Sequence, residues 1–128
     1  DVIKKNIKIK NFLKIFKLFK NCKYVWGGKT FNGIDCSALI QLYFKFNDWY
    51  YPRDTIDQIK FKRGKRKKFK FKSGDLIYWK GHVAVCINNK NLIHAYGPMK
   101  RVVIMPIGKT IKLIKVTTGL KVEKITSI

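Results

Sequence analysis

The sequence is poor in acidic residues and in cysteine, and it has no long apolar run. Only 7 Asp and Glu stand against 29 Lys and Arg in 128 residues, which gives a formal net charge of +22. This excess predicts an anionic partner but does not bear on the fold. No apolar run approaches the ~18 residues that a membrane-spanning helix needs. Lysines also interrupt the N-terminal apolar residues, so we expect neither a transmembrane segment nor a signal sequence.

The cysteines are too few and too irregularly spaced for a disulfide scaffold. Cys22, Cys36 and Cys86 are odd in number and form no C-x-x-C pair, so we expect at least one free thiol. A zinc site built from Cys36, the two histidines and one further cysteine is an alternative. Its long spacings match no common structural zinc site.

The remaining composition is that of a folded domain. Apolar residues make up 46% of the chain and aromatic residues 14%, which excludes a solvated disordered tail. The length suits one hydrophobic core and not two. We therefore expect residues 1–128 to form a single domain, and we take it to be a monomer. The chain starts at Asp1 without a methionine, so we expect it to be a piece of a longer chain.

The apolar pattern changes near Gly74. Before it, residues 7–20 have the spacing of an amphipathic basic helix, and residues 36–46 predict a second helix with Asp35 as its N-cap. Pro52 begins a further capped stretch. After Gly74, short apolar runs predict strands over 75–79, 82–87, 91–96, 101–105 and 122–128, with a turn at 88–90. Helices followed by strands indicate an α+β fold, with helices packed on a mostly antiparallel sheet of about five strands.

A basic run separates the two halves. Residues 60–72 hold nine Lys and Arg in thirteen positions, which predicts a solvated loop or edge that contacts an anionic polymer. The total charge has two interpretations. One is a surface selected for anionic wall polymers, muropeptides or nucleic acid. The other is lysine enrichment from an AT-biased genome, which the scatter of lysines over every segment favours.

Cys36 is a candidate nucleophile. It falls in the first turn of the predicted second helix, where unpaired amides and the helix dipole favour a thiolate. A cysteine nucleophile needs a base, and the chain has two histidines, His82 and His94. Neighbouring strands can place them side by side as base and orienting partner. The alternative is a buried helical cysteine with two ordinary strand histidines.

Six short strings in one order give the chain a family resemblance. They are Tyr24-Val25-Trp26-Gly27-Gly28, Gly33-Ile34-Asp35-Cys36-Ser37, Pro52-Arg53-Asp54-Thr55 with Gln58, Ser73-Gly74-Asp75-Leu76, Gly81-His82-Val83-Ala84-Val85 and Leu92-Ile93-His94-Ala95. Together they resemble the NlpC/P60 family of cell-wall cysteine peptidases over residues 12–128. The segment from Trp79 to His82 is most similar to proteobacterial members in which the peptidase follows bacterial SH3-like domains. This resemblance implies that the chain is the C-terminal part of a longer protein.

The resemblance implies a papain-like fold and a reaction. Members hydrolyse the bond between γ-D-glutamyl and a diamino acid, usually meso-diaminopimelate, in peptidoglycan stem peptides, without a metal or organic cofactor. By motif position, Cys36 resembles the nucleophile, His82 the general base and acid, and His94 the residue that orients His82. Tyr24 resembles a tyrosine that acts with the Cys36 amide on the oxyanion. We expect a Cys36 thiolate and a His82 imidazolium to form the active pair.

The resemblance also suggests substrate contacts. Asp35 and Ser37 match positions that hold the free amino terminus of L-Ala-γ-D-Glu. Arg53 is expected either to bind a substrate carboxylate or to pair with Asp54 or Asp57. Trp79 is expected either to line the substrate cleft or to pack in the core.

The chain departs from the family motifs at two positions where the family usually has glycine. Ala38 follows D-C-S and Ala84 follows H-V, and each added methyl group could narrow the catalytic cleft.

Two other functions stay open: a catalytically weak basic module that binds wall polymer or nucleic acid, and a thiol acyltransferase or amidase on the same fold. We expect the protein in the bacterial cell envelope, with recycling of wall peptides in the cytoplasm as the alternative.

Overall fold

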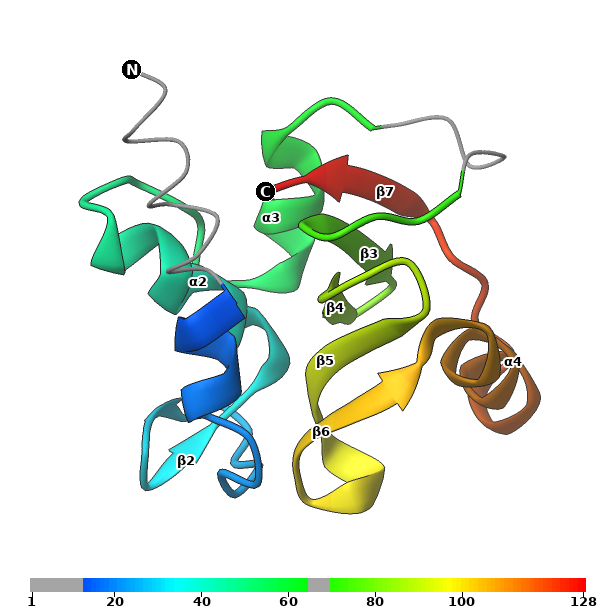
Figure 1. The fold of residues 1–128 in the computed structure, drawn as a ribbon, viewed down its shortest axis with the longest axis horizontal. Coiled ribbons are helices and arrows are strands. Elements are labelled where there is room, and N and C mark those ends of the chain that lie inside the picture. The colour runs from blue at the N-terminus through cyan, green and yellow to red at the C-terminus, as the bar shows by residue number, and fades with distance from the viewer. Residues whose placement is uncertain (1–12, 65–69) are drawn as a thin grey trace.

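The computed structural model describes residues 13–64 and 70–128. Its centre is an antiparallel sheet of five strands in the order β6-β5-β4-β3-β7 (Figure 1). The strands are β3 Asp75–Trp79, β4 His82–Cys86, β5 Asn91–Tyr96, β6 Arg101–Pro106 and β7 Lys124–Ser127. The C-terminal strand β7 returns to pair with β3, which places the last strand at one edge of the sheet.

Helices cover both faces of this sheet. The helical residues 13–18, α2 Cys36–Phe46 and α3 Thr55–Phe61 lie on one side, and α4 Ile107–Thr118 lies on the other (Figure 1). A small hairpin of β1 Lys29–Thr30 and β2 Gly33–Ile34 leads into α2, and a 3-10 turn, η1 Gly97–Met99, joins β5 to β6. The molecule is therefore a sheet between two helical layers.

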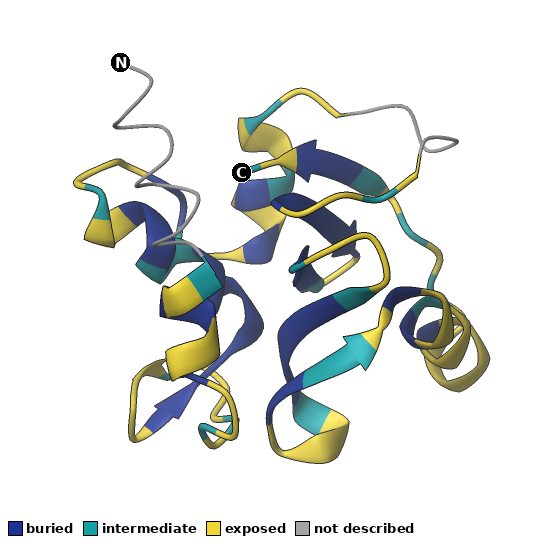
Figure 2. Cartoon of the chain, in the orientation of Figure 1, coloured by how far each residue is buried: buried dark blue, intermediate teal, exposed yellow. Residues whose placement is uncertain are grey.

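Alternation along the strands divides the interior into two cores. In β4, Val83 and Val85 face the side of α2, whereas Ala84 and Cys86 face α4. Since successive side chains of a strand point to opposite faces, one strand serves both cores. Figure 2 shows the buried strands and the exposed outer surface of α4. Each fully buried aliphatic side chain contributes ~1.5–3 kcal/mol relative to an exposed one, so the core on the α2 side fixes α2 against the sheet.

The expected α+β architecture is confirmed, and the bounds of most elements are close to the prediction. The helix over 36–46 and the strands over 75–79 and 91–96 appear as predicted. The strand predicted over 101–105 gains Pro106, while those predicted over 82–87 and 122–128 are shorter. At the turn between β4 and β5, the Asn88 side chain accepts the amides of Lys90 and Asn91 at 2.8 Å.

Helix α4 has no counterpart in the sequence prediction. Its segment holds Gly108 and many β-branched residues, which weaken intrinsic helix propensity. Its buried residues Ile107, Thr110 and Ile114 recur at helical spacing and pack toward the sheet. Tertiary burial therefore makes this helix, which local propensity alone does not indicate.

Two basic segments are only partly described. The helix predicted over 7–20 is helical over residues 13–18, and residues 7–12 lie outside the described part. In the basic run, residues 60 and 61 form the end of α3 and not a loop, while residues 65–69 are not described.

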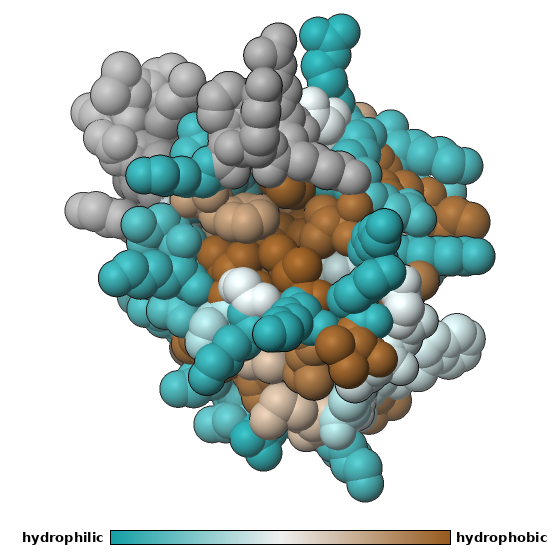
Figure 3. All heavy atoms as spheres, turned by 90° about the vertical axis from the view of Figure 1, so that its right-hand side faces the viewer, coloured by the Kyte–Doolittle hydropathy of each residue, from teal (hydrophilic) through white to brown (hydrophobic). Residues whose placement is uncertain are grey.

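The face that carries α4 exposes apolar side chains between hydrophilic ones (Figure 3). Leu113 is 39% exposed and Val116 is 76% exposed, and Lys109 and Lys112 stand beside them. Among the helices of the described ranges, none is both long enough and apolar enough to cross a membrane.

Candidate active site

The carboxylate of Asp35 organises the start of α2. It accepts the backbone amides of Ala38 and Gly27, each at 2.9 Å, and the Ser37 hydroxyl at 3.2 Å. The Arg53 guanidinium donates to both carboxylate oxygens, at 3.0 and 2.9 Å. Burial opposes ionisation of Asp35, but Arg53 and the two amides outweigh it and lower the pKa of the carboxyl group. The capping role expected for Asp35 is therefore confirmed.

Arg53 contacts neither of the two acids that the sequence suggested. Its ion pair is with Asp35, at 2.9 Å, and not with Asp54 or Asp57. The same guanidinium donates to the Ser37 hydroxyl at 2.9 Å and lies 3.4 Å from the Gly28 carbonyl oxygen. The terminal nitrogens of Arg53 are thus hydrogen-bonded to the loop before α2 and to the first turn of this helix. These hydrogen bonds order the site, and they are already formed when a substrate carboxylate arrives.

Cys36 is the first residue of α2 and is only 6% exposed. Its Sγ lies 4.0 Å from Thr55 Oγ1 and 3.9 Å from the Gly81 carbonyl oxygen. Burial is the largest influence on the thiol and raises its pKa above the ordinary value. Burial therefore favours the neutral thiol over the thiolate that the helix position predicts. As the first residue of a helix, Cys36 also offers a backbone amide that has no helical acceptor.

The two histidines pair as the sequence predicts. Nε2 of His82, the first residue of β4, lies 2.8 Å from Nδ1 of His94 in β5. Burial lowers the pKa of His82 to about 4. Burial, together with the neighbouring His82, lowers the pKa of His94 to about 2. Both rings are therefore neutral at neutral pH, so each carries one N–H and one acceptor nitrogen.

Met105 fixes which nitrogen carries each proton. Its Sδ lies 3.2 Å from Nε2 of His94, and a thioether sulfur accepts hydrogen bonds but cannot donate them. The proton of His94 is therefore on Nε2, and its Nδ1 accepts from the Nε2–H of His82. Neutral His82 then has an unprotonated Nδ1, which is the form that can take a proton from a thiol.

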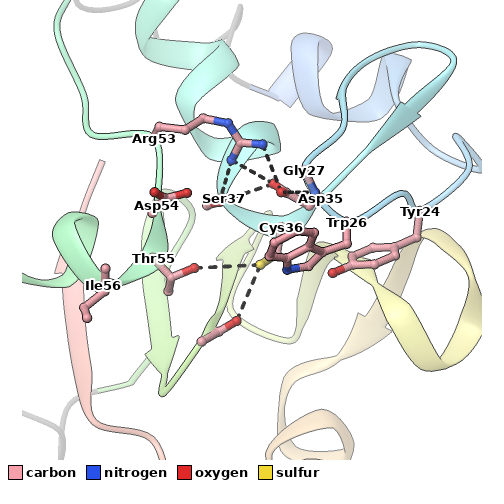
Figure 4. Close-up of a pocket in the computed structure, with 11 residues that line it drawn as sticks. Tyr24, Trp26, Gly27, Asp35, Cys36, Ser37, Arg53, Asp54, Thr55 and Ile56 are labelled. Atoms are coloured by element: carbon pink, nitrogen blue, oxygen red, sulfur yellow. Dashed lines mark hydrogen bonds and ion pairs between the residues drawn. The ribbon is translucent and has the colours of Figure 1, made fainter.

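A pocket of about 360 Å³ opens beside the thiol (Figure 4). It is lined by Tyr24, Trp26, Gly27, Asp35, Cys36, Ser37, Arg53, Asp54, Thr55, Ile56 and Gly81. The structure thus brings Tyr24, Cys36, Asp35, Ser37 and Arg53 to one cavity, as the motif positions predict.

Tyr24 presents its hydroxyl to this pocket. Figure 4 shows its ring directed toward the side of the pocket where Cys36 lies. Burial raises the pKa of Tyr24, and the nearby Cys36 and Asp35 raise it further, so the hydroxyl stays protonated and can donate at neutral pH. That geometry suits a donor to a developing oxyanion.

Trp79 does not line this pocket. It has 0% exposure, belongs to the core on the α4 side, and its ring centroid lies 5.5 Å from that of His82. Trp79 therefore packs in this core, and it also lines a second pocket together with Thr55 and Gly81. A role of Trp79 in binding substrate stays a prediction. Ala38 and Ala84 are also buried and absent from the pocket lining, so their methyl groups pack in the cores and do not narrow this pocket.

Four residues of the site carried no predicted role. Trp26 and Ile56 line the pocket and are 87% and 68% exposed, which is unusual for such large apolar side chains. Thr55 faces the thiol, and Met105 holds the histidine pair. Trp26 and Thr55 lie within the quoted motif strings, a signal that could have identified them, whereas Met105 becomes visible only once the register of β5 and β6 is known.

A buried cysteine at a helix N-terminus, beside an antiparallel sheet that carries a histidine pair, defines a papain-like cysteine peptidase domain. A model of the NlpC/P60 family matches residues 21–118. The chain belongs to the NlpC/P60 family of cell-wall cysteine peptidases.

Known relatives agree with this family. The chain is 32% identical over 101 residues to a gamma-D-glutamyl-L-lysine dipeptidyl-peptidase of Bacillus subtilis, covering 73% of this chain and 34% of the relative. It is 30% identical over 83 residues to the murein DD-endopeptidase MepS/murein LD-carboxypeptidase of Escherichia coli K12, covering 60% and 44%. A solved NlpC/P60 protein of Bacillus cereus superposes with a TM-score of 0.70 at 29% identity, covering 77% and 35%. The chain spans only about a third to a half of these relatives.

The hydrogen-bond chain from Met105 predicts one tautomer for each histidine. We expect histidine ring nitrogen shifts at neutral pH to show both rings protonated on Nε2. Met105→Leu removes the acceptor and is expected to give a mixture of tautomers, whereas Met99→Leu, a change at an exposed methionine, leaves the spectrum unchanged. Protonation of either ring on Nδ1 in the unmodified protein would contradict this assignment.

The pKa directions predict the pH dependence. His82 takes up a proton only well below its ordinary 6.5, and the Cys36 thiol ionises only above its ordinary 9.0. Between these limits the pair is neutral and competent, so activity should form a broad plateau that falls as His82 is protonated and again as the thiol loses its proton. Ultraviolet thiolate absorbance, taken as the difference between the unmodified protein and Cys36→Ala, should appear only on the alkaline side. Thiolate absorbance already present at neutral pH would show that a preformed ion pair exists.

Proposed function

We propose that the domain is a cysteine endopeptidase that hydrolyses the γ-D-glutamyl–diamino acid bond of peptidoglycan stem peptides in the bacterial cell envelope. One observation carries the proposal: the Cys36 thiol lies 3.9 Å from the carbonyl of Gly81, the residue directly before His82, and His82 is held by His94. The nucleophile thus lies beside the turn that leads into the strand of the base, and the base has the tautomer that can accept a proton. We take residues 1–128 as one such domain that acts as a monomer.

The reaction begins with proton transfer from Sγ of Cys36 to Nδ1 of His82 as the sulfur attacks the γ-carbonyl carbon of D-Glu. The carbonyl oxygen becomes an oxyanion, to which the Cys36 amide and the Tyr24 hydroxyl can donate. His82 then gives the proton to the leaving amine, the C–N bond breaks, and a thioester remains on Cys36. Water, deprotonated by His82, hydrolyses this thioester and restores the thiol.

His94 supports this cycle through its neutral ring. By accepting from Nε2–H of His82, it holds the base in the tautomer that the first step needs. Its own buried position, at 0% exposure, and its stacking on Tyr96 with ring centroids 4.6 Å apart keep it fixed. When His82 becomes an imidazolium during attack, the same hydrogen bond is strengthened by charge.

The acyl side of the substrate would lie in the pocket of Asp35 and Ser37. The structure qualifies the expected preference for a free N-terminal L-Ala, because both residues are already hydrogen-bonded to Arg53 and to each other. A substrate ammonium would share these acceptors with Arg53 and not meet a vacant carboxylate. We therefore expect the preference to be moderate, with acetylation of the alanine amine lowering activity without abolishing it.

Mass spectrometry of the pure protein with L-Ala-γ-D-Glu-diaminopimelate tests the proposal. The unmodified protein is expected to release the dipeptide L-Ala-D-Glu, and Cys36→Ala to release none, because Cys36 is the cysteine that lines the pocket beside the turn before His82. Cys22→Ala is the matched control and should retain activity, since its thiol donates to the Phe31 carbonyl at 3.3 Å and does not line the pocket.

The same assay on intact sacculi distinguishes trimming of the wall from recycling of free fragments. Failure to cleave either substrate, together with salt-sensitive binding to sacculi or nucleic acid, would indicate a basic binding module instead. Transfer of an acyl group to an added amine, in place of hydrolysis, would indicate an acyltransferase.

A further inference from the structure

Helix α4 carries an apolar groove on its outer face, the face that Figure 3 shows. The groove encloses about 400 Å³ and is lined by Met105 of β6 and by Lys109, Lys112, Leu113 and Val116 of the helix. We call it the α4 groove. Its four helix residues recur at intervals of three and four positions, so they form one stripe along the helix.

This stripe is not the one that attaches α4 to the protein. The attaching residues, Ile107, Thr110 and Ile114, are buried toward the sheet. On the outer stripe, Leu113 and Val116 are exposed although both are large and apolar. An apolar patch with a charged rim is typical of a surface that contacts another molecule or phase.

The surroundings of the α4 groove are basic. No acidic residue occurs between Asp75 and Glu123, whereas this stretch holds eight Lys and Arg. It includes β4, β5, β6 and α4. Within residues 13–64 and 70–128 the one ion pair lies on the α2 side, so neither Lys109 nor Lys112 is paired with an acid there. The charge complementary to the groove is therefore negative.

A second copy of the chain does not complement this groove. A two-fold interface pairs a patch with itself, which would set Lys109 and Lys112 against the same two lysines. The net charge of +22 on each copy adds to the repulsion. A stable protein partner would also need a larger surface than the five residues of the groove, since such interfaces use ~20–30 residues a side.

An anionic lipid bilayer complements both the apolar stripe and the charge. Leu113 and Val116 can enter the boundary between headgroups and acyl chains, while the ammonium groups of Lys109 and Lys112 extend to the headgroups. Two apolar side chains with a few lysines suffice for weak, reversible binding of this kind. Because α2 and α4 lie on opposite sides of the sheet (Figure 1), such contact leaves the pocket of Cys36 accessible.

We propose that the α4 groove is a docking surface for an anionic lipid bilayer. Helix α4 lies along the bilayer surface, with Leu113 and Val116 inserted and the two lysines at the headgroups. The proposal goes beyond the peptidase function and does not rest on it, because docking is measured without any substrate. Loss of one proposal therefore leaves the other standing.

Sedimentation with lipid vesicles at ~0.15 M salt tests the proposal. The unmodified protein should bind vesicles of equal parts phosphatidylglycerol and phosphatidylcholine, and should bind vesicles of phosphatidylcholine alone at least tenfold more weakly. Leu113→Gln/Val116→Gln should lower the affinity for the anionic vesicles roughly tenfold, because the stripe no longer enters the bilayer. Val116→Gln alone should lower it severalfold, and this side chain is too exposed to be needed for folding.

Leu18→Gln/Phe46→Gln is the matched control for the apolar residues. Leu18 and Phe46 are 64% and 67% exposed and belong to the helices on the other side of the sheet. Their substitution should leave the affinity for anionic vesicles unchanged. An equal loss in this control and in Leu113→Gln/Val116→Gln would overturn the proposal, as would no loss in either.

A second pair of variants separates docking at the groove from attraction by the total charge. Lys109→Gln/Lys112→Gln should lower the affinity roughly 10- to 30-fold, about fivefold for each lysine at the headgroups. Lys14→Gln/Lys17→Gln removes two exposed lysines on the α2 side and should lower it less than threefold, because charges more than ~8 Å from the bilayer are screened.

Equal losses from the two lysine pairs would show that the net charge alone binds the vesicles, and would overturn the proposal. Absence of binding to the anionic vesicles would overturn it too. Analytical ultracentrifugation without lipid covers the remaining occupant: a dimer that Val116→Gln dissociates would show that a second copy, and not a bilayer, covers the groove.

Discussion

The Asp35 carboxylate joins three segments of the chain at the point where the nucleophile begins its helix. It caps α2 through Ala38, closes the loop of Gly27, and holds Arg53 from the segment before α3. Cys36 follows Asp35 directly, so the position of the thiol depends on this carboxylate. An ionised acid at a helix N-terminus also opposes formation of a second negative charge beside it, and Asp35 is among the influences that raise the pKa of Cys36. Burial is the larger cause of the raised pKa of Cys36, and the anchor that places the nucleophile adds to it.

A neutral thiol must lose its proton before it can attack a substrate, so it needs a base, and His82 of the histidine pair is the candidate for that base. Because burial keeps both rings neutral, activation of the thiol depends on which nitrogen of His82 is unprotonated. The hydrogen bonds from His82 to His94 and from His94 to Met105 determine this. In the proposed mechanism, activation of the thiol thus depends on proton positions set by three side chains on β4, β5 and β6.

The sequence predicted what depends on local chemistry and missed what depends on register. Helix α2 was predicted in full because a capping acid precedes an apolar run, and the histidine pair because two short strands flank a turn. Helix α4 was missed because its stability comes from burial of Ile114 and its neighbours and not from propensity. The partners of Arg53 and His94 lie 18 and 11 residues away in sequence, and only the folded chain shows that they meet.

We propose that the acyl half of the substrate lies beside Asp35, in the pocket that opens at the Cys36 thiol. The most direct test is to quench turnover of L-Ala-γ-D-Glu-meso-diaminopimelate with acid and to measure the mass of the intact protein. We expect a transient adduct on Cys36 whose mass equals that of the L-Ala-γ-D-Glu acyl group. An adduct that contains diaminopimelate, or turnover without any adduct on Cys36, would contradict it.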